Sequence, residues 1–226
     1  MAAALAAATV GGVAQADIVA YWHFNSLLPN PNTPHGITAD QGNGMILADG
    51  TVGSSFWAST ASNPQLTSYA GFADNARGGA PAGSALGLAN SSSNSAGNAN
   101  GFSLVVHVDL TNFESVSLSY GSRASGSGFG FSSHAWSYST DGVNFTPITT
   151  FTGMNAASVQ VKNLGAISAL DHQADAYFRL TVDGATASNG HNRIDNVVVE
   201  GTSVAVPAPG AAALLGLAGL LARRRR

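Results

Sequence analysis

The chain has 226 residues and no cysteine, so disulfide bonds cannot contribute to its stability. Its body must therefore be held by a hydrophobic core, with or without a bound ion. Charged residues make up only 9% of the chain, and no lysine or arginine precedes Arg77. Glycine, serine, asparagine and threonine are frequent instead, so small polar side chains must keep the surface soluble. Such a surface suits an extracellular matrix.

Basic residues are scarce outside the C-terminus. Residues 17–209 contain five of the nine basic residues and all twelve acidic ones, which leaves this part of the chain with a net charge of −7. Nucleic-acid binding requires a basic surface that neutralises phosphates. The charge balance therefore argues against nucleic acid as a partner.

Motifs of known catalytic sites are also absent. The six histidines are spread singly, without the spacing that places two imidazoles on one helical face for zinc. Neither a Gly-x-Ser-x-Gly elbow nor a Walker loop occurs. Glycoside hydrolysis needs two carboxylates, yet the only glutamates are Glu114 and Glu200, and Asp49, Asp141 and Asp183 each precede a glycine in a turn-like context. The sequence predicts a protein without catalysis.

The body lacks sustained helical periodicity and shows a period of two instead. Apolar and polar residues alternate over 102–110 and again over 116–120, which is typical of strands with one buried face. We expect these two strands to pair with each other. The Asp141-Gly142 dipeptide lies between two further alternating runs and predicts a hairpin.

Further short strands complete the expected fold. They are predicted at 18–24, 45–47, 85–88, 148–151, 158–161, 176–182 and 194–199. The low-complexity stretches 89–101 and 121–130 are interpreted as long loops. The fold class is therefore all-β, a two-sheet antiparallel β-sandwich of the jelly-roll kind, with a hydrophobic helix at the C-terminus.

The C-terminus has three successive parts. A proline-bounded junction is followed by the apolar run 211–222 and by four terminal arginines. This order resembles the PEP-CTERM sorting signal, a bacterial tag that an exosortase recognises and removes. The residues that carry the resemblance are Val206, Pro207, Ala208, Pro209, Gly210, Arg223, Arg224, Arg225 and Arg226. Ala208 stands where the family usually has glutamate.

The resemblance implies an exosortase-type processing enzyme and a transient membrane association through the apolar run. That run is shorter than the roughly 20 apolar residues that span a bilayer, so a permanent anchor is not expected. By the positive-inside rule the arginines stay in the cytoplasm during insertion. An ordinary tail anchor is the alternative.

The N-terminus is consistent with export. Residues 1–16 are rich in alanine, valine and glycine, and Ala14 and Ala16 before Asp17 fit a signal-peptide cleavage site. The usual basic residues are missing, so we hypothesise that the true start codon lies upstream. A disordered alanine-rich tail is the alternative.

The body resembles exported bacterial β-sandwich domains that often precede this sorting signal. The resemblance is carried by residues 20–25, 136–145, 177–180 and 192–197. Such domains look like the jelly rolls of laminin-G-type and carbohydrate-binding modules, and their role is generally unassigned. The predicted organisation is a signal peptide at 1–16, the sandwich at 17–201, a spacer at 202–209, and the sorting helix with its arginines at 210–226.

Two sites are predicted in the body. Asn25 follows the first strand and Asp195 and Asn196 begin the last, and these strands commonly lie side by side in a jelly roll. Their oxygens suit a structural calcium ion, and in similar sandwich modules a comparable Ile-Asp-Asn supplies such a ligand. The alternative is that Asp195 pairs with Arg193 or caps a neighbouring loop. Trp57 has the weakest strand context of the aromatic residues and is the expected glycan-binding platform.

These observations predict an exported, surface-sorted, non-catalytic protein of the cell envelope or extracellular polysaccharide matrix. A structural or adhesive role is the first hypothesis. A carbohydrate-binding module is the second, and exposed aromatic residues along one sheet would favour it. A glycan-active hydrolase comes third, because it needs a pocket that holds two carboxylates.

Overall fold

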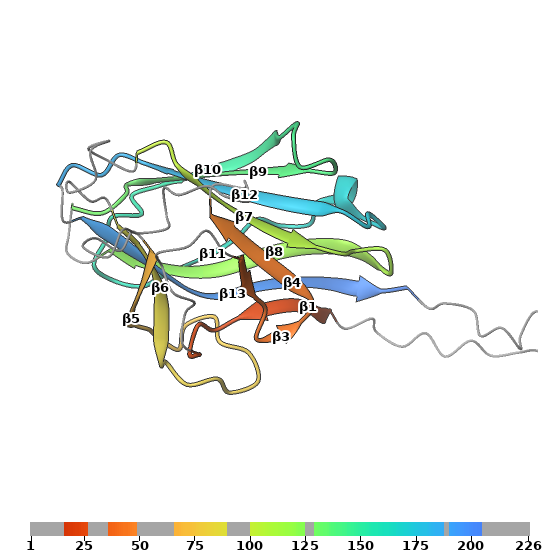
Figure 1. The fold of residues 1–226 in the computed structure, drawn as a ribbon, viewed down its shortest axis with the longest axis horizontal. Coiled ribbons are helices and arrows are strands. Elements are labelled where there is room, and N and C mark those ends of the chain that lie inside the picture. The colour runs from red at the N-terminus through yellow and green to blue at the C-terminus, as the bar shows by residue number, and fades with distance from the viewer. Residues whose placement is uncertain are drawn as a thin grey trace, which may run out of the picture.

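The computed structural model describes residues 16–26, 36–48, 66–89, 100–124, 129–187 and 190–204, which form an all-β structure (Figure 1). Thirteen strands and one short 3-10 helix, Ser168–Leu170, make up the regular structure of these residues. The strands form two antiparallel sheets, so the predicted antiparallel two-sheet sandwich is confirmed. In the described ranges, no helix reaches the length and apolar character that crossing a bilayer requires.

Seven strands form the first sheet, which we call sheet A. The long strand β13 pairs with β8 along one edge and with β1 and β6 along the other. β11 extends the sheet beside β8, β3 lies beside β1, and β5 lies beside β6. The strands of sheet A are β1 (Asp17–Trp22), β3 (Gln41–Gly42), β5 (Leu66–Ala70), β6 (Ser84–Ala89), β8 (Phe113–Ala124), β11 (Gln160–Asn163) and β13 (His191–Ser203).

Six strands form the second sheet, sheet B, in the order β10-β9-β12-β7-β4-β2. They are β2 (Gly36–Thr38), β4 (Gly44–Ala48), β7 (Ser103–Val108), β9 (Ser133–Ser139), β10 (Thr146–Thr152) and β12 (Ala176–Asp183). The alternating residues of both sheets point inward and form one hydrophobic core. The short strands β2, β3 and β5 were not predicted, because their sequences carry too few apolar residues to show an alternation.

The predicted pairing of the strands at 102–110 and 116–120 is wrong. β7 lies in sheet B between β12 and β4, whereas β8 lies in sheet A between β13 and β11. The chain crosses from one sheet to the other over residues 109–112, so the apolar faces of the two strands both line the core between the sheets. An alternating pattern fixes which face is buried but not which strand lies alongside, and both arrangements satisfy it.

Two boundaries also differ from the prediction. β8 continues through Ala124 because its last residues pair with β13, so the first part of the predicted 121–130 loop is strand. β13 continues to Ser203, inside the predicted 202–209 spacer. Ala14 of the predicted signal peptide, residues 205–209 of the predicted spacer, and the predicted C-terminal helix with its sorting residues lie outside the described residues.

The predicted hairpin at Asp141-Gly142 is confirmed. β9 and β10 pair on either side of it, with Thr146 opposite Tyr138. The Asp141 carboxylate accepts the backbone N–H groups of Val143 and Asn144, both at 2.8 Å. These hydrogen bonds, together with one from the Asn144 side chain, hold the pKa of Asp141 well below its usual range. The aspartate therefore shapes the turn.

The first and last strands lie side by side, as predicted. β1 and β13 pair antiparallel, with Asp17 opposite Gly201 and Trp22 opposite Val197. The beginning of the folded body thus lies next to its end. Ala16 and Asp17, the described residues of the predicted cleavage site, are both exposed there.

One polar cluster is buried between the sheets. The His134 ring is fully buried, with Nδ1 3.0 Å from the Tyr120 hydroxyl and Nε2 3.1 Å from the Asn192 amide nitrogen. Asn192 also accepts the Phe131 N–H at 2.7 Å. Burial, followed by the nearby positive charge of Lys162, lowers the pKa of His134 to about 3. The imidazole is therefore neutral at physiological pH and belongs to the core.

Candidate functional site

The outer face of sheet A is covered by residues 71–83, which we call the cover loop. Phe72 of this loop is only 6% exposed and lies against Gly121 of β8. Asn75 donates a hydrogen bond to Ser119 at 3.1 Å, and Arg77 forms an ion pair of 2.8 Å with Glu200. The loop is thus attached to two strands of the sheet beneath it.

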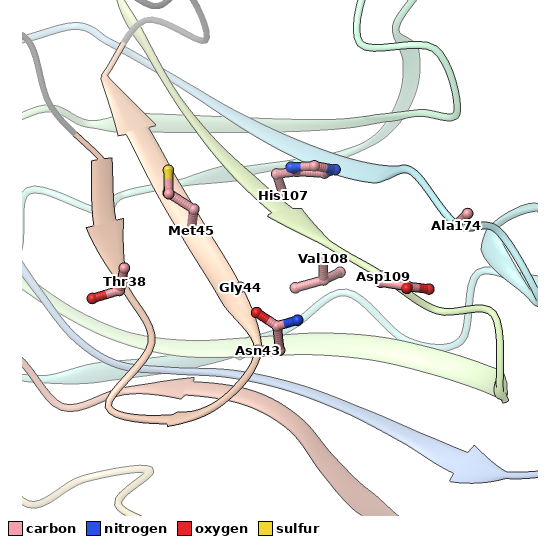
Figure 2. Close-up of a pocket in the computed structure, with 8 residues that line it drawn as sticks. All are labelled: Thr38, Asn43, Gly44, Met45, His107, Val108, Asp109 and Ala174. Carbon is pink, nitrogen blue, oxygen red and sulfur yellow. The ribbon is translucent and has the colours of Figure 1, made fainter.

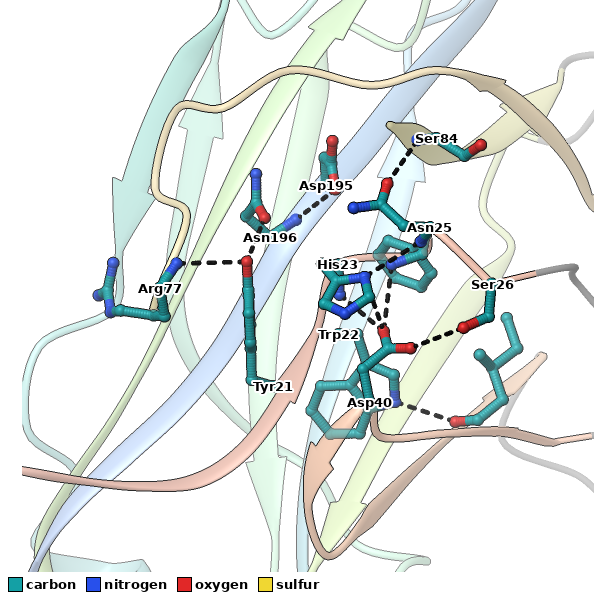
Figure 3. A network of polar contacts seen from close by, with 12 residues as sticks. Tyr21, Trp22, His23, Asn25, Ser26, Asp40, Arg77, Ser84, Asp195 and Asn196 are labelled. Carbon is teal, nitrogen blue, oxygen red and sulfur yellow. Dashed lines mark hydrogen bonds and ion pairs between the residues drawn. The ribbon is translucent and has the colours of Figure 1, made fainter. Parts of the chain in front are cut away.

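The residues predicted to bind calcium all contact this cover loop or the start of β6 (Figure 3). Asn25 accepts the backbone N–H of Ser84 at 2.6 Å and donates to the Pro81 carbonyl at 3.0 Å. Asp195 and Asn196 reach the same loop from β13. The structure therefore brings the predicted residues together, although the amide oxygen of Asn25 is already used by Ser84.

Asp195 is a buried carboxylate that caps the loop, which is the structural alternative considered above. It is 1% exposed, and its two oxygens accept the N–H groups of Phe72 at 2.9 Å and Asn196 at 2.8 Å. Among the described residues no cation forms an ion pair with it, and Arg193 donates to the Ala70 carbonyl instead. Burial raises the pKa of Asp195 to about 7.

Asn196 connects the loop to β1. Its amide nitrogen donates to the carbonyls of Phe72 at 2.7 Å and Asp74 at 3.0 Å, and its amide oxygen accepts the Tyr21 hydroxyl. The register of β13 against β8 shifts after Asp195, and Asn196 has a φ of 50°, in the left-handed region that asparagine tolerates better than most residues. The irregularity turns the Asn196 amide toward the loop.

Three oxygens converge beside Gly71, where the cover loop begins. A Cβ at this position would collide with Asp195 Oδ2 and with the carbonyl oxygens of Ala82 and Ser84. Glycine is required here because of this close approach. A carboxylate and two backbone carbonyls are the ligand types that calcium takes. No group of three or more His, Cys, Asp or Glu side chains arranged for metal binding occurs in the described residues, so backbone oxygens would dominate such a site.

Asp40 is a further part of this network that the sequence did not indicate. Its Oδ2 accepts the backbone N–H of His23 at 2.8 Å and of Phe24 at 3.2 Å, and its Oδ1 accepts the Ser26 hydroxyl at 3.2 Å. The carboxylate thereby positions the segment that leads to Asn25, as Figure 3 shows. Asp40 precedes Gln41-Gly42, an unremarkable turn sequence, so only its tertiary contacts identify it.

The outer face of sheet B carries a group of planar and apolar side chains, which we call the sheet B face. The rings of His107 and Tyr177, on neighbouring strands, are stacked with centroids 4.4 Å apart and an interplanar angle of 7°. His107 Nε2 lies 3.0 Å from Asp175 Oδ1, and its side chain is 35% exposed. The members of the sheet B face are Met45, Leu47, Val105, His107, Phe145, Tyr177 and Arg179.

A cation–π pair lies beside the stacked rings. The Arg179 guanidinium packs 3.8 Å from the centre of the Phe145 ring, and it forms no ion pair with any described residue. On the other side, Met45 is 37% exposed and lines a groove of about 230 Å³ with His107 and Asp109 (Figure 2). Planar surfaces, an apolar side chain and polar groups thus lie next to one another on one face.

The sequence predictions missed this face. Tyr177 was among the aromatic residues considered, but Trp57, the preferred platform, lies outside the described residues. The other tryptophans, Trp22 and Trp136, are buried, as their alternation predicts. The signal that would have identified the face is the polar side of the alternation, since His107 and Tyr177 both occupy outward positions of their strands.

Comparison with known proteins gives structural neighbours only. No family model matches the chain, and no curated protein matches it. The CBM22-1 xylan-binding domain of Paenibacillus barcinonensis Xyn10C is 12% identical with a TM-score of 0.46, over 86% of this chain and 100% of that one. TmCBM61, solved with β-1,4-galactotriose, is 11% identical with a TM-score of 0.40, and the match covers 69% of this chain and 86% of that one. The K2 adhesin domain of Lys-gingipain is 13% identical with a TM-score of 0.40, and the match covers 83% of this chain and 98% of that one. Likeness of this degree carries no information on ligands, so function is argued from the residues.

Proposed function

We propose that this protein is a non-catalytic, polysaccharide-binding β-sandwich that acts as an adhesive component of the cell envelope or extracellular matrix. The observation that carries the proposal is the sheet B face, where the stacked His107–Tyr177 pair lies between the Arg179–Phe145 pair and a shallow groove lined by His107 and Met45. This arrangement unites the adhesive role and the carbohydrate-binding module that the sequence left as alternatives.

The chemistry of the sheet B face suits a sugar chain. A pyranose has an apolar face that packs on a ring and hydroxyl groups around its edge that need hydrogen-bond partners. Tyr177 and His107 supply the stacking surface. Asp175, Asp109 and the Arg179 guanidinium supply charged groups at the rim that can form hydrogen bonds with sugar hydroxyls.

Binding to soluble β-linked polysaccharides, including xylan and galactan, tests the proposal by affinity electrophoresis and calorimetry. Tyr177→Ala removes the centre of the stacking surface, and we expect the affinity to fall about tenfold or more, the scale of one aromatic contact. Tyr177→Phe should bind nearly as well as the wild type. Phe129→Ala is the matched control, because Phe129 is 54% exposed outside this face. Equal binding by Tyr177→Ala and the wild type would refute the proposal.

The proposal includes the localisation of the protein. The tripartite C-terminus and the signal-peptide-like N-terminus support export, exosortase processing and transient membrane association. Mass spectrometry of the protein from its native host should find a chain that begins at Asp17 and lacks Arg223, Arg224, Arg225 and Arg226. A mature chain that keeps all four arginines would contradict processing.

We also propose that calcium binds beside Gly71. The unpaired, buried Asp195 carboxylate and the carbonyls of Ala82 and Ser84 support this site, and Asn25 and Asn196 hold the loop that forms it. Calcium at millimolar concentration should raise the melting temperature of the wild type, and EGTA should lower it again. Asp195→Asn should abolish the response. An unchanged melting temperature of the wild type in EGTA and in calcium rejects the site.

A further inference from the structure

Two arginines lie directly opposite each other on the outer face of sheet A. Arg123 of β8 and Arg193 of β13 form a register pair, and both side chains point away from the core because their neighbours Ala124 and Ile194 are buried. Side chains at directly opposite positions have Cβ atoms about 4.5 to 5.5 Å apart. Like charges at this separation destabilise a sheet, so the pair calls for a compensating group.

The described part of the protein does not supply that group. Neither arginine forms an ion pair with a described carboxylate, and the Nε atoms of both are buried without a hydrogen-bond partner. The one hydrogen bond recorded for the pair joins Arg193 Nη1 to the Ala70 carbonyl at 3.2 Å. Outside the described ranges the whole chain has a single acidic residue, Asp49. In a body with a net charge of −7, two adjacent arginines without an ion pair among the described residues are distinctive.

An aromatic surface adjoins the arginines. The Tyr69 ring of β5 stacks on the His191 ring with centroids 4.2 Å apart and an interplanar angle of 6°, and the Arg193 guanidinium lies 5.2 Å from the Tyr69 centroid. The intervening strand β6 has only small residues on its outer side, namely Ala85, Gly87 and Ala89, so the tyrosine ring can lie across it. Burial and the neighbouring Arg123 lower the pKa of Arg193, which agrees with two guanidinium groups that lack an anion.

We propose that Arg123 and Arg193, together with Tyr69, bind the carboxylate of a uronic acid residue in an acidic polysaccharide. The planar guanidinium group matches a carboxylate through two parallel hydrogen bonds, and two such groups side by side can share both carboxylate oxygens. The Tyr69 ring offers a surface for the pyranose that carries the carboxylate. This site lies on the opposite sheet from the sheet B face, so it stands or falls independently of the function proposed above.

Polygalacturonate is the probe, and the full-length chain is tested by affinity electrophoresis at 50 mM salt. Arg123→Gln and Arg193→Gln should each weaken binding about tenfold, and the double variant should abolish it, as should 0.5 M salt, which screens surface charges. Arg123→Lys keeps the charge but loses the planar fork, so it should bind more weakly than the wild type. Lys162→Gln is the matched control, because Lys162 of β11 is a cation that packs over Phe151 and belongs to neither proposed binding surface, and it should leave polygalacturonate binding unchanged.

Two further probes define the chemistry. Carboxyl-reduced polygalacturonate keeps the sugar chain without its charge and should not bind, whereas dextran sulfate should bind more weakly than polygalacturonate. Equal or tighter binding of dextran sulfate overturns the assignment to carboxylates. Wild-type affinity in the double variant, with its melting temperature maintained, overturns the site itself. Because removal of one arginine relieves repulsion, the single variants should melt no lower than the wild type.

Discussion

The outer faces of the two sheets differ although the same alternating pattern produces both. On sheet A the outward-pointing Tyr21 is only 2% exposed, and its hydroxyl accepts the Arg77 N–H of the cover loop at 3.2 Å and donates to Asn196 of β13. On sheet B the outward-pointing Met45 and His107 remain 37% and 35% exposed. Both faces carry aromatic residues, but only one uses them to hold the protein's own chain.

This difference separates aromatic residues that stabilise the fold from those available to a ligand. A tyrosine that is buried by a loop and hydrogen-bonded at its hydroxyl contributes mainly to stability. On sheet B the half-buried Tyr177 ring stacks on His107 and lies close to Gly142, and the His107 ring beside it is still partly exposed to a ligand. Substitutions on the two faces should therefore change different quantities, namely the free energy of unfolding on sheet A and the affinity for glycan on sheet B.

The largest effect is expected for Asn196→Ala on the covered face. The substitution leaves the Phe72 and Asp74 carbonyls without these donors and the Tyr21 hydroxyl without its acceptor, and it places alanine at a φ of 50°. We expect the free energy of unfolding to fall by about 3 to 5 kcal/mol, measured by urea denaturation. Asn144→Ala in an exposed turn is the control. A loss below about 1 kcal/mol would show that the cover loop is not held by Asn196.

Acid should destabilise the whole sandwich, because His134 lies in the core between the two sheets. Its folded-state pKa of about 3 is below the ordinary value of 6.5, so the folded protein binds fewer protons than the unfolded chain between these pH values. The free energy of unfolding should therefore decrease as the pH is lowered through this window. At pH 4 the decrease should be about 3 kcal/mol relative to neutral pH.

The comparison uses His134→Gln, which cannot titrate. Asp195, with its pKa raised to about 7, changes stability in the opposite direction between pH 4 and 7, but both proteins share it. The difference between the two unfolding curves thus isolates the histidine. An equal pH dependence in both proteins would show that His134 is not buried in its neutral form.

A smaller loss is expected when the ion pair of the cover loop is removed. Arg77 and Glu200 are 28% and 22% exposed at their side chains and lie 2.8 Å apart. Arg77→Ala should lower the free energy of unfolding by about 1 kcal/mol, the usual worth of a partly exposed pair, and high salt should reduce that difference. Glycan binding at the sheet B face should not change, and a change there would mean that the two faces are coupled.

The smallest effect on stability is expected on the sheet B face itself. Tyr177→Ala should change the free energy of unfolding by no more than about 0.5 to 1 kcal/mol, because the ring is half-buried and contacts the His107 ring and Gly142 near the protein surface. The same variant is the one expected to lose glycan affinity. A large stability loss without an affinity change would place Tyr177 among the structural aromatics and remove the contrast between the faces.

Local pattern predicted much of this fold. Alternation over 102–110 and 176–182 located strands with the correct buried faces, and Asp141-Gly142 located the hairpin. The pairing of strands was less predictable, because the neighbour of each strand depends on the arrangement of the whole sheet. Residues 121–124 illustrate this, since glycine and serine suggest a loop, whereas hydrogen bonding to β13 makes them strand.

The sites were predictable to the same degree. The proximity of Asn25 to Asp195 and Asn196 could be predicted because the first and last strands of a sandwich are commonly neighbours. The stacked pairs on sheet B and the arginine pair on sheet A depend on cross-strand register, which the sequence does not encode locally. Asp40 depends on a loop meeting the end of β1 and carries no pattern of its own.

The position of β13 also determines how the domain would resist mechanical pulling. Tension applied at the C-terminal end acts along this strand, which is hydrogen-bonded to β8 on one edge and to β1 and β6 on the other. Such a load acts parallel to the strand and shears the hydrogen bonds on both of its edges. These hydrogen bonds must therefore break together and cannot break one after another. A body suspended from this end would yield as a unit, at high force.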